Sequence, residues 1–151
     1  MTTTVSDDVS YVDGKGDLGL ILQLVSRTSG LGFCAIARVS DKVWTPYLVH
    51  DAIAFGIAAG KSVTMSGLPC EQVLKTRKPL VIADARKWRQ GTRDSVSGFP
   101  QFQVFVSVPV FGRDGRVIAT LCAADRKSVP LRAGDIAELF TLFAKLVATH
   151  L

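Results

Sequence analysis

The stretch that decides the fold is FQVFVSVPVFGRDGRVIATLCA, residues 102–123. Valine occupies every second position from 104 to 110, which is the period of a β-strand with two unlike faces. Gly115 closes the short polar segment that follows and supplies the backbone freedom of a tight hairpin turn. The sequence therefore predicts strands at 102–110 and 116–123, joined by a turn at 111–115.

Helices are expected at both ends of this domain. Asp17 is the expected N-cap of a helix that runs to Ser29, and a second helix is expected over 132–151. Each has one apolar stripe for a core and a second apolar face besides. The second faces carry Leu20 and Leu24 on the first helix and Leu142 and Leu146 on the last. They predict either a homodimer through the terminal helices or two helices that cover each other.

The segments between these helices complete an α+β domain. Further strands are expected at 33–39, 43–49 and 80–83, and a short helix at 68–77. Residues 85–101 form a long loop, and loops of this length in a compact domain are usually functional. We expect residues 1–16 to be a loose N-terminal segment and residues 17–151 a single domain.

Composition excludes several classes of protein. The 151 residues are 48% hydrophobic, yet contain neither a signal peptide nor an apolar run that would span a membrane, so a soluble, cytoplasmic protein is expected. Cys34, Cys70 and Cys122 are odd in number and widely spaced, which favours neither a disulfide framework nor a metal site. The net charge of +5 gathers around residues 75–93, but no nucleic-acid-binding motif accompanies it.

Several residues are candidates for a ligand pocket. Trp88 and Phe99 place apolar bulk in a polar loop. Phe105 and Ser107 share the strand face opposite the valines, and Ser107 and Thr120 are polar residues on central strands that would orient a ligand. The loop also carries cations that favour a small polar or anionic ligand: Arg86, Lys87, Arg89 and Arg93.

Longer motifs add a resemblance that covers residues 17–151. The motifs are Trp44, residues 51–56 (DAIAFG), 70–74 (CEQVL), 78–85 (KPLVIADA), 106–109 (VSVP) and 120–125 (TLCAAD). Together they resemble GAF domains, in particular those of bacterial sensor histidine kinases and diguanylate cyclases. The resemblance implies a GAF-like (profilin-like) antiparallel sheet of five or six strands, with the terminal helices on one face. A ligand pocket closed by the middle loops would lie on the other face.

The resemblance does not name a ligand or a cofactor. Bilin attachment in the family uses a cysteine followed by histidine, and neither His50 nor His150 follows a cysteine. The motif of cyclic-nucleotide GAF domains is not visible. The free methionine sulfoxide reductases of the family carry their cysteines in the loop before the strand that here begins at 102, and that loop has none. We expect Cys70 to pack inward and line the pocket, with no catalytic residue.

Three functions therefore stay open. The leading one is a small-molecule-sensing regulatory domain of a two-component histidine kinase or a related signalling protein. The second is a stand-alone enzyme of the free methionine sulfoxide reductase type. The third is a dimerisation module with a vestigial pocket.

Overall fold

A computed structural model of the chain describes residues 9–88 and 99–151. The elements, in chain order, are α1 (Val9–Ser29), β1 (Phe33–Ser40), β2 (Val43–Asp51), β3 (Val63–Thr64), α2 (Pro69–Thr76), β4 (Leu80–Ile82), α3 (Ala85–Trp88), β5 (Val104–Phe111), β6 (Val117–Asp125) and α4 (Ala133–Ala148). The described strands form one sheet in the order β3-β2-β1-β6-β5-β4, and every neighbouring pair is antiparallel. The predicted α+β class, with five or six antiparallel strands, is confirmed.

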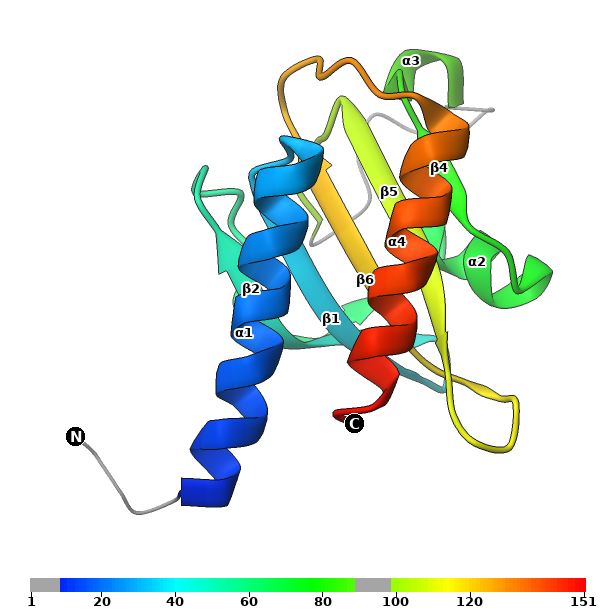
Figure 1. Cartoon of the computed structure of the whole chain (residues 1–151). Coiled ribbons are helices and arrows are strands. Elements are labelled where there is room, and N and C mark those ends of the chain that lie inside the picture. Colours follow the sequence, from blue (N-terminus) through cyan, green and yellow to red (C-terminus); the bar gives the residue numbers. More distant parts are fainter. Residues whose placement is uncertain (1–8, 89–98) are drawn as a thin grey trace.

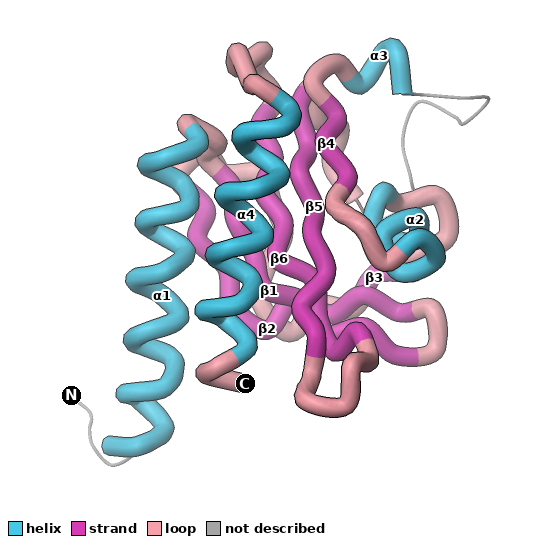
Figure 2. Tube along the Cα trace, turned by 45° about the vertical axis from the view of Figure 1, so that its right-hand side comes forward, coloured by secondary structure: helices cyan, strands magenta, loops and turns pink. Residues whose placement is uncertain are grey.

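Helices α1 and α4 lie side by side on one face of the sheet (Figures 1 and 2). They run in opposite directions, and their apolar stripes pack on the even-numbered valines of β5 and on Ala119, Leu121 and Ala123 of β6. Both terminal helices therefore cover the same face, as the sequence predicted. The alternation of valine in β5 determines this arrangement because it leaves one strand face uniformly apolar and β-branched.

The other face of the sheet is covered by the chain between β2 and β5. Phe33, Trp44, Phe55 and Phe105 form a second buried cluster there, together with residues of α2 and β4. The sheet therefore separates two apolar layers, one aliphatic and one rich in aromatic rings.

The predicted start of the first helix is wrong. Helix α1 begins at Val9, so Asp17 lies inside it and is not its N-cap. The carboxylate of Asp17 instead lies 3.5 Å from Nε2 of His150, at the end of α4. An exposed aspartate is tolerated within a helix when it faces solvent and a basic partner. Of residues 1–16, the structure describes 9–16, and these are helical.

The last helix contains a smaller difference. Helix α4 ends at Ala148, before the predicted end at Leu151, and Thr149 donates its side-chain hydroxyl to the carbonyl of Leu146. A helical turn, α3, opens the long segment 85–101. Among the described residues, no helix is both long and apolar enough to cross a membrane.

Candidate functional site

The aromatic layer converges on Phe99, which ends the long segment before β5. Its ring centroid lies 5.7 Å from that of Trp44, 5.8 Å from Phe55 and 5.9 Å from Phe105. The first two contacts are edge-to-face, a preferred geometry for aromatic pairs. Phe99 is only 6% exposed, so it is the buried plug of this layer and anchors the end of the 85–101 segment.

A small polar cluster lies beneath the aromatic rings, at the centre of the sheet. Cys70 Sγ is 3.7 Å from Ser107 Oγ and 4.0 Å from Thr120 Oγ1. The indole Nε1 of Trp44 donates a hydrogen bond of 3.3 Å to Thr120 Oγ1. All four side chains are buried, so the interior of this face combines hydrogen-bonding groups with apolar rings.

Strand register and a helix start bring this cluster together. Ser107 of β5 pairs directly with Cys122 of β6, and Thr120 lies two residues before Cys122 and so on the same face. Pro69 occupies the first turn of α2, where a missing N–H costs no hydrogen bond. Cys70, the next residue, contacts Ser107 and Thr120 of these strands.

The thiols at this site perturb each other. The hydrogen bond from Cys122 lowers the pKa of Cys70; burial opposes this shift, and bonds to Ser107 and Thr120 add to it. The same bond, together with burial, raises the pKa of Cys122. Cys34, on the other face of the sheet, has its pKa raised to about 12 by burial. Cys70 is buried, with about 1% of its surface exposed.

The rim of the site is formed by the turn that follows β4. Asp84 accepts hydrogen bonds from the backbone N–H of Arg86 at 3.0 Å and from Nε2 of Gln103 at 3.0 Å. The Arg86 guanidinium pairs with the same carboxylate at 3.1 Å and holds the pKa of Asp84 at about 2. This turn leads into α3, which carries Trp88, half-buried, with its ring 6.5 Å from that of Phe102.

The facing wall is the segment between β2 and β3. The carboxylate of Asp51 accepts bonds from the backbone N–H groups of Ile53, Phe55 and Gly56. From the other side, Arg126 donates to the carbonyls of residues 53, 54 and 55 and lies 5.4 Å above the Phe55 ring. Two charged side chains therefore hold the backbone of this segment in place through charge-assisted hydrogen bonds, which are stronger than those between neutral groups.

The structure places the six predicted site residues on one side of the sheet. It brings Cys70, Ser107 and Thr120 into contact, and it brings Phe99 against Phe105. Trp88 lies at the edge and reaches this group only through Phe102. Of the predicted cations, Arg86 is engaged by Asp84, Lys87 is exposed, and Arg89 and Arg93 lie outside the described residues.

Two residues of the cluster were not predicted as part of the site. Cys122 shares its strand face with Thr120, so the two-residue period of β6 is the signal that could have identified it. Trp44 comes from a distant strand, and only the fold brings its indole to Thr120. Within residues 9–88 and 99–151, no group of three or more His, Cys, Asp or Glu side chains is arranged to hold a metal ion.

The comparisons with known proteins agree with this architecture. The sequence matches the GAF domain family over residues 18–151, and the chain belongs to that family. Among curated proteins, none matches it in sequence. The GAF domain of a phosphoenolpyruvate-protein phosphotransferase from Acinetobacter has the same fold, with a TM-score of 0.70 and 15% identity over 91% of this chain and 81% of that one.

Two further solved structures extend the range of functions found on this fold. A methyl-accepting chemotaxis protein has a TM-score of 0.68 and 17% identity, covering 92% of this chain and 88% of that one. The free methionine-R-sulfoxide reductase of Neisseria meningitidis, solved with its substrate, has a TM-score of 0.69 and 15% identity, covering 99% and 93%. At such identities the similarity shows the fold alone.

Proposed function

We propose that this GAF domain is a cytoplasmic sensory module, part of a histidine kinase or a related signalling protein. It binds a small molecule between the 85–101 segment and the sheet, and it has no catalysis of its own. The observation that carries the proposal is the buried polar cluster of Cys70, Ser107 and Thr120 within an aromatic layer. A layer that serves stability alone is filled most cheaply by apolar groups, whereas a binding site needs a few oriented polar ones.

The floor and the rim select different parts of the ligand. The described floor offers a neutral hydroxyl pair and a thiol, which suit an uncharged polar group. Lys87 is exposed at the rim and is suited to an anionic group, while Arg86 is already held by Asp84. The ligand is therefore a small polar molecule whose negative charge, where it has one, faces α3.

Thermal-shift screening of a metabolite library tests this function. A ligand raises the melting temperature by mass action, and Trp88→Ala removes that rise while the protein stays folded. Leu151→Ala is the control, because it removes an exposed apolar side chain that lies beyond the end of α4 and outside both proposed sites. A ligand whose affinity survives changes at Trp88, Phe99 and Phe105 alike would place its site elsewhere and refute the proposal.

The reductase similarity favours a second candidate function, and Cys70 decides between the two. The reductases of the family carry their cysteines in the loop before β5, where this chain has none, and Cys70 lies instead at the start of α2 beside Ser107. We expect no turnover of free methionine sulfoxide with a thiol reductant. Turnover that Cys70→Ser abolishes would establish the reductase function instead.

The proposed sensory function includes a homodimer through the terminal helices. Leu20 and Leu24 on α1 are 63% and 50% exposed, and Leu142 and Leu146 on α4 are 58% and 44% exposed. Because α1 and α4 run antiparallel, with Asp17 near His150, the two pairs of leucines lie at matching levels. Four neighbouring exposed leucines form an apolar patch of the kind that a second subunit covers.

A further inference from the structure

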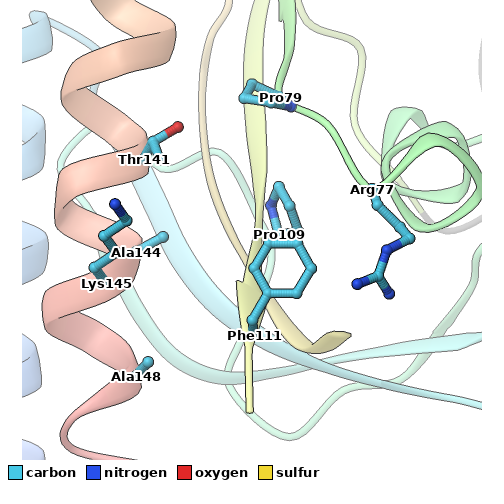
Figure 3. Close-up of a pocket in the computed structure, with 8 residues that line it drawn as sticks. All are labelled: Arg77, Pro79, Pro109, Phe111, Thr141, Ala144, Lys145 and Ala148. Atoms are coloured by element: carbon cyan, nitrogen blue, oxygen red, sulfur yellow. The ribbon is translucent and has the colours of Figure 1, made fainter. Parts of the chain in front are cut away.

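A cavity lies at the edge of the sheet, away from the candidate site. Strand β4 pairs with β5 only as far as Ser107, so the outer edge of β5 is open from there to the hairpin. A groove of about 320 Å³ lies over this edge, between α4 and the end of α2 (Figure 3). Its lining residues are Arg77, Pro79, Pro109, Phe111, Thr141, Ala144, Lys145 and Ala148.

The floor of the groove is apolar and stays open because its residues are small or rigid. Ala144 and Ala148 lie four residues apart on one face of α4 and leave room that larger side chains would fill. Pro79 and Pro109 have no N–H, so the strand edge offers no donor at these positions. The Phe111 ring is 39% exposed, whereas the other seven residues of β5 are buried.

Two cations stand on opposite walls of this apolar floor (Figure 3). Arg77 follows α2 in the left-handed conformation, with φ of 60°, which turns its side chain toward the hairpin. Its guanidinium lies 5.0 Å above the centre of the Phe111 ring and donates a hydrogen bond of 2.8 Å to the carbonyl of Gly115. The guanidinium is therefore held in place while some of its donors stay unused.

Among the described residues, no acidic side chain forms an ion pair with either cation. None of the eight lining residues is Asp or Glu. In the part of the chain that the structure describes, the ion pairs involve Arg86, Arg116, Arg132 and His150, and neither Arg77 nor Lys145. A fixed, unpaired guanidinium beside an apolar surface favours a carboxylate, which accepts two parallel hydrogen bonds from it.

We propose that this groove binds a small amphipathic carboxylate, an apolar body with one carboxylate at its end. The body lies along Pro109, Ala144 and Ala148, and the carboxylate pairs with Arg77, while Lys145 adds positive charge from the opposite wall. Cavities of this size are at the lower end of the range for small-molecule sites. The groove shares no lining residue with the Trp88–Phe99 site, so the two proposals stand or fall separately.

Titration of the whole chain, labelled with ¹⁵N, tests the proposal with octanoate as the probe. Amide shifts are expected to saturate at Arg77, Phe111, Lys145 and Ala148. Neutral 1-octanol is expected to bind about tenfold more weakly, because it lacks the charge-assisted hydrogen bonds. Equal affinity for both probes, or shifts centred on other residues, would overturn the proposal.

Four variants test the roles of charge, of shape and of the location of the site. Arg77→Gln with Lys145→Gln is expected to weaken octanoate binding about tenfold, whereas Lys61→Gln with Lys75→Gln, the same charge change at exposed positions outside the groove, leaves it within about twofold. Ala148→Leu fills the groove without changing charge and also weakens binding. Octanoate binding persists in Trp88→Ala. A Gln pair that is folded by its amide spectrum and binds like the wild type would refute the proposal.

Discussion

The residue that organises the centre of the candidate site is Thr120. Its hydroxyl accepts from the Trp44 indole and contacts Cys70, which leaves the Trp44 N–H paired in a fully buried place. Thr120→Val keeps the shape and removes this acceptor. We expect the free energy of unfolding to fall by about 1–3 kcal/mol, the cost of an unsatisfied buried donor.

Urea unfolding measures this change, and Thr141→Val is its control. Thr141 bonds only back to the carbonyl of Ala137 within α4, and this carbonyl also has its helical partner. The control is expected to change stability by less than about 0.5 kcal/mol. Equal losses in the two variants would mean that the Trp44 bond contributes nothing special.

Asp84 makes the rim of the site sensitive to acid. Its pKa is lowered to about 2 by the bonds to Arg86, so the native state favours the ionised carboxylate. A carboxyl with a lowered native pKa stabilises the fold fully above its unfolded pKa of about 4, and this contribution is lost as the pH falls toward 2. Asp84→Asn is therefore expected to lower the melting temperature at pH 7, and less so at pH 2.5.

The matched comparison is Asp114→Asn. Asp114 also pairs with a neighbouring arginine, at 3.3 Å, but its side chain is 61% exposed and it lies in the hairpin. Surface pairs of this kind contribute little, so its effect at pH 7 is expected to be smaller. A melting-temperature deficit of Asp84→Asn that is the same at pH 7 and pH 2.5 would contradict the role assigned to its charge.

At the level of elements, the join between α1 and β1 depends on Gly32. A Cβ at this position would lie 2.4 Å from Cγ2 of Ile53. The backbone N–H of Gly32 donates a hydrogen bond of 3.0 Å to the carboxylate of Asp125. Gly32→Ala is expected to lower the free energy of unfolding by about 1–3 kcal/mol through overpacking. Adding Ile53→Ala is expected to recover part of that loss.

Gly134→Ala controls for the change of residue type. A Cβ at Gly134 meets nothing within 4 Å, and the position is in the first turn of α4. Alanine there is expected to be neutral or to stabilise by up to about 1 kcal/mol. Chemical denaturation of the wild type, Gly32→Ala, Ile53→Ala and the double variant gives the coupling energy between the two positions. If the losses of the two single variants simply add in the double variant, the clash is excluded.

The elements were predictable where a pattern is local. The valines of β5 identified its two faces. Pro46, a residue that sheets confine to edges and bulges, lies where the register of β2 shifts opposite Ile36 and Ala37. The start of α1 was not predictable in this way, because Asp17 is a good N-cap residue in any sequence and only its distance to His150 shows its role. Strand β3 was missed, since two residues carry no period.

In the candidate site, too, features that depend on a local pattern were predictable and features that depend on long-range contacts were not. Ser107 and Phe105 were identified because a strand face is encoded at a spacing of two residues. The contacts of Thr120 with Trp44 and of Cys70 with Ser107 join residues 76 and 37 positions apart, so they depend on the order of strands in the sheet. Long-range pairing of this kind is a property of topology, which no local pattern contains.

At the scale of the whole molecule, the sheet separates three surfaces with different occupants. The aromatic face carries the proposed sensory site, the open edge of β5 carries the groove, and the outer side of α1 and α4 carries the exposed leucines. Helix α2 touches two of them, with Cys70 at its start and Arg77 just past its end. The two proposed sites therefore each include a residue at one end of the same short helix.

The last prediction concerns assembly through the leucines. Burying one leucine contributes roughly 1.5–3 kcal/mol, so four from each subunit are enough to offset the cost of association. We expect light scattering of the wild type to give twice the 16.2 kDa of one chain. Leu142→Glu with Leu146→Glu places charges in the interface and is expected to give the monomer mass, as is Leu20→Glu with Leu24→Glu.

Ala133→Glu with Gly134→Glu is the control for this experiment. It adds the same two charges to α4 at exposed positions in its first turn, outside the leucine patch, where acidic residues favour the helix dipole. This variant is expected to remain a dimer. A dimer that survives both pairs of leucine substitutions would mean that another surface holds the subunits together. A monomeric wild type would refute the homodimer.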